Sequence, residues 1–177
     1  MSNENLTQKN WTSWHHMLHK ELLRDKKLIP NGAKLLIAVS GGQDSMALLN
    51  LINDIKNQHN WFVHVWHGDH QWHEKSKRYA IELKSYCHKK NISFFCDQAN
   101  KKSISSEEKA RDWRYKKLSE RANQLLSENS KNIDIYLITG HTNTDNAETF
   151  LLNLARGSNY AGLSYIEKKD YLNIIFI

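Results

Sequence analysis

The sequence predicts an α/β fold: a three-layer sandwich in which a mainly parallel sheet lies between two layers of helices. Short apolar runs alternate with longer amphipathic stretches along the 177 residues. This alternation is typical of parallel strands joined by crossover helices. The length fits one domain on the usual range of roughly 100–200 residues. No internal repeat or low-complexity linker divides the chain.

Five short apolar runs predict the strands. The first, "KLLIAVS", follows Pro30, Asn31 and Gly32, which end the helix before it. A short run of this kind, bounded by turn residues, is typical of a strand buried on both faces. The predicted strands cover residues 34–40, 61–66, 92–96, 133–139 and 171–177.

Apolar residues at spacings of three and four predict the helices. In the first helix, Trp11, Trp14, Leu18 and Leu22 share one face. The predicted helices cover residues 11–27, 44–58, 74–90, 106–128 and 144–156. We therefore expect an N-terminal amphipathic helix within residues 1–30 and a single α/β domain over residues 31–177.

Composition narrows the classes of function. The net charge of +6 suits an anionic partner such as a nucleotide or nucleic acid, although it is weak support alone. Cys87 and Cys96 are too few for a disulfide framework. No apolar run approaches membrane-spanning length, and residues 1–10 resemble neither a signal nor a transit peptide. We expect no membrane partner and a protein that stays where it is made.

The stretch Ser40-Gly41-Gly42-Gln43-Asp44-Ser45 joins the first strand to the next helix. At such a junction in a parallel sheet, backbone N–H groups and the helix N-terminus favour anions. Glycine lets the backbone approach a phosphate without a β-carbon in the way. A capped glycine turn with no ligand is the alternative interpretation of these residues alone.

Two common phosphate-binding motifs are absent. A Walker A loop needs a Gly-Lys pair, and the chain contains none. The dinucleotide fingerprint GxGxxG after the first strand is missing as well. These two classes of phosphate site are therefore not indicated, and the capped glycine turn stays the alternative for the loop read alone.

Further polar residues stand where the same ligand could reach them. His141, Asp145 and Glu148 follow the fourth strand at spacings of four and three, which brings them to one side if a helix begins near residue 144. Arg111 and Arg114 are neighbours on a predicted helix. Without a ligand, these residues would only complement a helix dipole or form weak surface pairs.

Histidines recur every three residues at His64, His67, His70 and His73. Such a repeat invites a metal interpretation. We expect the first on a strand and the others in a turn, so that they share no face.

Four motifs give the sequence a family resemblance. Residues 40–45 resemble the SGGxDS signature of the N-type ATP pyrophosphatases, the PP-loop enzymes. Residues 140–163 resemble the GHxxxDxxET…LLxxxRGxxxxGL block of tRNA(Ile)-lysidine synthetases, and residues 107–115 resemble their ExxARxxRY helix. Residues 68–76 resemble the DHxWxxxS form associated with cyanobacterial and plastid members.

This resemblance implies a Rossmann-like fold of the adenine nucleotide alpha hydrolase type and a set of site residues. Catalytic roles are implied for five residues, ATP contacts for the loop and two others, and Mg²⁺ binding for two carboxylates. The catalytic set is Asp44, Arg111, Arg114, His141 and Asp145; the ATP contacts are Ser40, Gly41, Gly42, Gln43, Asp44, Ser45, His70 and Arg156; the Mg²⁺ ligands are Asp44 and Glu148.

The implied reaction joins free lysine to C2 of the wobble cytidine in tRNA(Ile) with a CAU anticodon. ATP first adenylates the tRNA, and AMP and pyrophosphate are released. The resemblance also implies a PP-loop catalytic domain over residues 31–177, without the C-terminal tRNA-binding part of typical relatives. It implies a location in bacterial cytoplasm or plastid stroma, and we expect a homodimer. The alternatives are another PP-loop tRNA-modifying enzyme of thiolase type, or a non-catalytic nucleotide-binding remnant.

Overall fold

A five-stranded parallel sheet forms the centre of the molecule. The computed structural model describes residues 11–24, 28–72, 74–100, 104–127 and 135–139, together with the backbone of 173–176. The elements in chain order are α2 (Ser13–Arg24), β1 (Lys34–Ala38), α3 (Gln43–His59), β2 (Phe62–Asp69), α4 (Ser76–Lys89), β3 (Ser93–Gln98), α5 (Glu107–Ser127), β4 (Ile135–Thr139) and β5 (Asn173–Phe176). The strand order is β3-β2-β1-β4-β5, and every pairing is parallel.

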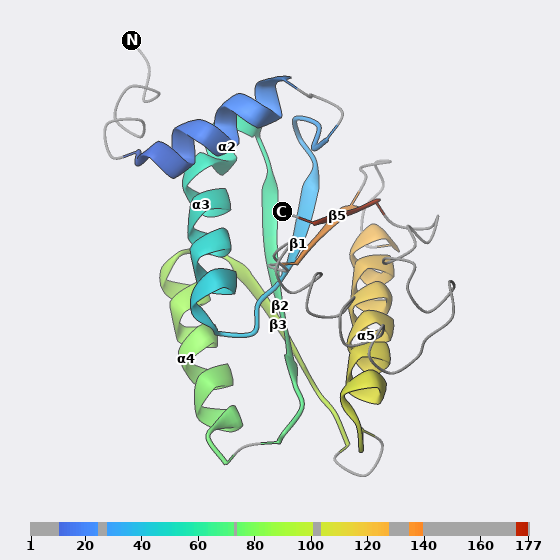
Figure 1. Cartoon of the computed structure of the whole chain (residues 1–177). Coiled ribbons are helices and arrows are strands. Elements are labelled where there is room, and N and C mark those ends of the chain that lie inside the picture. Colours follow the sequence, from blue (N-terminus) through green and yellow to red (C-terminus); the bar gives the residue numbers. More distant parts are fainter. Residues whose placement is uncertain are drawn as a thin grey trace, which may run out of the picture.

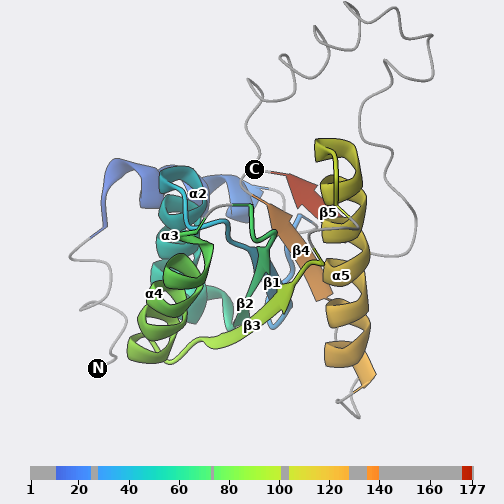
Figure 2. The same ribbon diagram turned by 90° about the horizontal axis from the view of Figure 1, so that it is seen from below.

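Helices cover both faces of this sheet. Helices α2, α3 and α4 lie on one side and α5 lies on the other, as the two perpendicular views show (Figure 1 and Figure 2). The predicted three-layer α/β sandwich is therefore confirmed. The helix predicted over residues 144–156 lies outside the described residues.

The core follows from the alternation of side chains along β1. Leu35 and Ile37 belong to the apolar cluster under α2, α3 and α4, whereas Leu36 belongs to the cluster under α5. Successive strand residues point to opposite faces, so a continuous apolar run is what a strand covered on both sides requires. This is the reason that "KLLIAVS" contains no polar alternation.

Two strands continue beyond their predicted ends. β3 ends at Gln98 instead of residue 96. β2 continues to Asp69 instead of ending at residue 66, because Gly68 and Asp69 pair with Asp97 and Gln98 of β3. The pattern of apolar residues ends before the hydrogen-bonded ladder does. As a result, residues expected in a turn lie at the carboxyl end of a strand.

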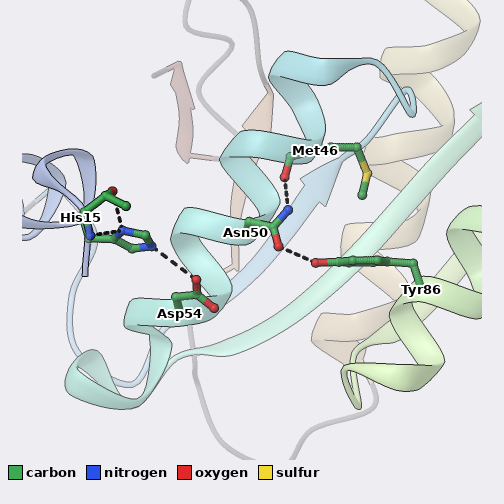
Figure 3. A network of polar contacts seen from close by, with 6 residues as sticks. His15, Met46, Asn50, Asp54 and Tyr86 are labelled. Carbon is green, nitrogen blue, oxygen red and sulfur yellow. Dashed lines mark hydrogen bonds and ion pairs between the residues drawn. The ribbon is translucent and has the colours of Figure 1, made fainter. Parts of the chain in front are cut away.

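Polar contacts join the helices of one layer, as Figure 3 shows. His15 of α2 lies 3.2 Å from the Asp54 carboxylate of α3. Asn50 of α3 donates to the Met46 carbonyl oxygen at 2.8 Å and accepts the hydroxyl hydrogen of Tyr86 from α4. These contacts fix the three helices relative to one another.

The strand order also places the ligand-binding end of the sheet. The chain moves outward from β1 through β2 to β3 and then returns to β4 on the other side of β1. In open parallel sheets, ligands bind beyond the carboxyl ends of the strands where the order reverses. The site is therefore expected beyond the ends of β1 and β4.

Candidate functional site

The glycine loop lies at the end of β1 and leads directly into α3. Gly41 has a φ of +90°, a conformation that favours glycine. Gly42 is the N-cap of α3 and has no side chain to accept from the first-turn N–H groups. These groups have no partner within the helix, so they are open to an anion beside the loop.

Two serine hydroxyls brace this loop. The Ser40 and Ser45 Oγ atoms lie 3.1 Å apart, the Gly42 N–H donates to Ser40 Oγ at 3.2 Å, and the Ser45 hydroxyl donates to the Gly42 carbonyl oxygen at 3.0 Å. Ser45 is buried, whereas residues 40–44 are exposed. These hydrogen bonds hold the shape of the loop. Asp44, in the first turn of α3, makes no hydrogen bond or ion pair to the described residues.

The carboxyl end of β2 lies next to the end of β1 and its loop. His67 is buried, and its Nδ1 lies 2.7 Å from the Val39 carbonyl oxygen. Because a carbonyl oxygen only accepts, Nδ1 carries the hydrogen. Buried Asp69 accepts from the Gln71 backbone N–H at 2.8 Å and from the Gln98 side chain at 3.3 Å. His67 thus braces the end of β1, and Asp69 shapes the turn after β2.

His70 occupies an aromatic pocket at this end. Its ring stacks on Trp72 with centroids 5.2 Å apart and meets the edge of Trp113 at 5.1 Å. Burial and the nearby Arg114 charge lower the pKa of His70. Nδ1 is buried and has no hydrogen-bond partner in the described part of the chain. A neutral imidazole with a free nitrogen therefore stands beside the cavity.

Arg114 brings positive charge to the same place from α5. Its Nε is buried without a hydrogen-bond partner among the described residues, and burial lowers the pKa of the guanidinium. Arginine stays charged in proteins, and a poorly solvated charge needs an anionic partner. Arg111 instead lies over the Tyr115 ring, 5.4 Å from its centroid. Arg114 is thus suited to bind an anion within the cavity.

These groups meet around a cavity of about 420 Å³ beyond the ends of β1, β2 and β4. Of the predicted residues, Ser40, Ser45, His70 and Arg114 line it. Other residues that line the cavity were not predicted, among them Gly68, Asp69, Trp72, Tyr79, Glu107 and Thr139. Gly68 and Asp69 belong to the motif at residues 68–76, and Thr139 ends a predicted strand. The sequence therefore did mark these positions. Predicted residues His141, Asp145, Glu148 and Arg156 lie outside the described residues.

The histidine repeat does not form a metal site in the described part of the chain. His64 and His67 both lie on β2, which corrects the expectation that only the first is on a strand; His73 lies outside the described residues. Within the described ranges, no three His, Cys, Asp or Glu side chains come close enough to hold a metal ion.

The described helices also include none that is long and apolar enough to cross a membrane.

Known proteins resemble the chain in sequence. It is 83% identical over 172 residues to the tRNA(Ile)-lysidine synthase of Prochlorococcus marinus subsp. pastoris, a match that covers 97% of this chain and 51% of the relative. It is 35% identical over 153 residues to the chloroplastic tRNA(Ile)-lysidine synthase of Zygnema circumcarinatum, which covers 86% of this chain and 34% of that relative. The chain thus spans about half or less of the length of these curated relatives.

A solved structure and a family model complete the comparison. The U34-tRNA thiolase NcsA from Methanococcus maripaludis has a similar fold, with a TM-score of 0.65 and 19% identity over 91% of this chain and 59% of that chain. At this identity the likeness concerns the fold alone. The family model described as "PP-loop domain" matches residues 13–177. Because this match covers nearly the whole sequence, the chain belongs to the PP-loop domain family.

Proposed function

We propose that this chain is the catalytic part of an enzyme that uses ATP to join lysine to C2 of the wobble cytidine of tRNA(Ile) with a CAU anticodon. The observation that carries the proposal is that Ser40 and Ser45, which bracket the glycine turn at the start of α3, line the same cavity as Arg114. The names of the relatives supply the substrate class. We assign catalysis to residues 31–177, against which α2 packs.

The phosphates of ATP would lie between the loop and Arg114. N–H groups at the start of α3 can donate to phosphate oxygens, and the Ser40 and Ser45 hydroxyls border the same space. The Arg114 guanidinium can donate to an anion with two parallel N–H groups. A phosphate here would accept from the Arg114 Nε, which has no hydrogen-bond partner among the described residues.

Asp44 fits a role in magnesium binding. It is exposed beside the loop and makes no contact with a described cation, and Mg²⁺ prefers carboxylate and phosphate oxygens. The ion would neutralise charge on the phosphates of bound ATP. Asp44 would hold it there, with Glu148 as a second proposed ligand.

The reaction would take place in two displacements. The C2 oxygen of cytidine attacks the α-phosphorus of ATP, and pyrophosphate leaves. The ε-amine of lysine then attacks C2, and AMP leaves with the former C2 oxygen. We propose that Arg111 and Arg114 stabilise the charge that develops on pyrophosphate, and that His141 and Asp145 act near the reacting atoms. ATP binding by Arg156 and His70 completes the proposed site.

The thiolase alternative finds little support in the cysteines. The sequence has two. Cys87 is buried, and burial raises its pKa to about 11. The Cys96 residue is exposed, and the pKa of its thiol is raised by partial desolvation and by the nearby Asp69 and Asp97 carboxylates. A reactive thiol needs a lowered pKa, and iron–sulfur clusters usually take more than two cysteine ligands. The lysine reaction is therefore favoured.

The proposed setting follows from the relatives. We propose a location in bacterial cytoplasm or plastid stroma, because the relatives are cyanobacterial and chloroplastic. Free lysine, ATP and the tRNA would be the partners. A homodimer stays a prediction, which light scattering of the purified chain would check.

The decisive experiment measures the transfer of labelled lysine to a transcript of CAU-anticodon tRNA(Ile), with ATP and Mg²⁺. The Asp44→Ala variant should lose the transfer. Asp54→Ala is the matched control, because Asp54 is an exposed carboxylate on the same helix that contacts His15 instead of the cavity. If the folded chain binds ATP but never transfers lysine or releases pyrophosphate, the remnant interpretation replaces the proposal.

A further inference from the structure

Two aromatic side chains stand on the rim of the cavity and remain largely exposed. Trp72, in the segment after β2, is 48% exposed, and Tyr79 of α4 is 50% exposed. Both line the cavity. Large aromatic groups are usually buried because water contact costs them free energy. Their exposure beside a site for a nucleic-acid substrate suggests a binding surface.

Trp72 is held in place by the turn before it. Gln71 has a φ of +55°, its backbone N–H donates to Asp69, and its side-chain amide donates to the Ala99 carbonyl oxygen at 3.0 Å. His70 stacks on the indole ring. A ring fixed in this way loses little conformational freedom when a ligand stacks on it.

Basic residues lie a few positions after Trp72 in the sequence. Lys75, Lys77 and Arg78 are all exposed at the start of α4. Arg78 pairs with Glu82 at 2.7 Å, whereas Lys75 and Lys77 make no ion pair with a described residue. Exposed Glu74 is the acidic neighbour in the same stretch. Lys75 is four residues before Tyr79 and so lies on the same side of α4, whereas Lys77 is two residues before it and points to the other side.

We propose that Trp72 and Tyr79, together with Lys75, form a surface on which unpaired RNA bases next to the reacting nucleotide stack. This inference rests on the proposed function and adds a contact surface for its RNA substrate. Aromatic platforms combined with a basic track are how proteins bind single strands. The bases of a duplex are already stacked and cannot reach such rings, so the surface selects a loop.

The test measures binding of the whole chain to an RNA hairpin whose loop carries the CAU anticodon, by fluorescence anisotropy without ATP or lysine. One base stacked on an aromatic ring is worth about 1–3 kcal/mol, so Trp72→Ala should weaken hairpin binding by about 5- to 150-fold. Trp72→Phe should restore most of the affinity. Binding to a blunt RNA duplex should change much less.

The matched control is Trp14→Ala. Trp14 is 64% exposed and lies on α2, which contacts the last turns of α3, far from the loop at its first turn. This variant should bind the hairpin like the unmodified chain. An equal loss in both tryptophan variants, or no loss in Trp72→Ala, would overturn the proposal.

The salt dependence tests the two lysines separately. Each phosphate contact to a single strand adds about 0.7 to the slope of log K against log salt. Lys75→Ala should therefore reduce the slope by about 0.7, whereas Lys77→Ala, on the other side of α4 from Tyr79, should leave it unchanged. An unchanged slope in Lys75→Ala would show that Lys75 does not contact the RNA. The binding assay involves no turnover, so its result does not depend on lysine transfer. Absence of lysine transfer would contradict the proposed function, whereas a selective loss of hairpin binding in Trp72→Ala would still support the stacking surface.

Discussion

Gly68 shows how one missing side chain shapes the cavity wall. A Cβ atom at this position would lie 2.6 Å from Cη2 of Trp66 and 3.1 Å from Cζ3 of Trp113. The Trp66 ring cannot easily move, because it is fully buried and its Nε1 donates to Asp97 at 2.7 Å. Close packing of two indoles against the backbone therefore requires glycine here.

The first prediction is that Gly68→Ala lowers the free energy of unfolding by about 1–3 kcal/mol, the usual cost of overpacking a core. Urea unfolding measures this cost. In a Trp66→Phe background, the same substitution should cost less, because the smaller ring removes the atom that clashes. Equal costs in the two backgrounds would contradict the steric explanation.

The second prediction concerns the imidazole of His70. Burial is the largest cause that lowers its pKa, and the Arg114 charge adds to it. NMR titration should therefore find a pKa below 6.5, and Arg114→Gln should raise it only partly, since burial remains. Exposed His88 provides the control resonance. A His70 pKa at or above 6.5 in the unmodified chain would refute this description of the site.

At the scale of elements, histidines connect α2 to the end of α3. His19 Nδ1 lies 3.0 Å from Nε2 of buried His59, which stacks on Trp61 with centroids 4.4 Å apart. Burial is the first cause that lowers the pKa of both histidines. A protonated pair would place two like charges side by side, so this junction needs neutral rings.

The third prediction follows from the sign of these shifts. A histidine whose pKa is lower in the folded state binds fewer protons there than in the unfolded chain, so it favours folding fully above about pH 6.5 and loses that contribution as the pH falls below it. Stability should therefore decrease between pH 7.5 and 5.5, and His59→Gln should make the decrease shallower. Urea unfolding at both pH values gives the comparison. His88→Gln should keep the original slope, and the same slope in His59→Gln would show that the junction is not responsible.

The elements could be predicted from the sequence better than their contacts. Apolar runs gave all strands within the described residues, since a strand buried on both faces has few alternatives. The end of β2 was missed because Gly68 and Asp69 are not apolar, and only their pairing with β3 extends the strand. Loop residues 40–45 were identified from glycine and spacing. Trp72 belongs to the motif at residues 68–76, but its exposure and that of Tyr79 could not be predicted, because exposure depends on what packs around a side chain.

At the scale of the whole molecule, the reversal of strand order explains why distant residues meet. Ser40 follows β1, His70 follows β2, Thr139 ends β4, and Arg114 belongs to α5, yet all line one cavity. The carboxyl ends of parallel strands lie at one edge of the sheet, and α5 approaches that edge from the opposite face to α3 (Figure 2). Topology therefore assembles the site, and the side chains only determine its chemistry.

The last prediction tests whether that site binds a nucleotide. A ligand that binds only the folded state stabilises it by about 2.7 kcal/mol at a hundred times its Kd. For a chain of this size, each kcal/mol raises the Tm by about 2–4 °C, so saturating ATP with Mg²⁺ should raise the Tm by about 5–10 °C. Arg114→Gln should remove most of this rise, because the phosphates would lose the partly buried cation that faces them. Arg24→Gln, an exposed arginine of α2 paired with Glu21, should keep it. A rise that survives in Arg114→Gln would place the nucleotide elsewhere, and no rise in the unmodified chain would contradict ATP binding at this cavity.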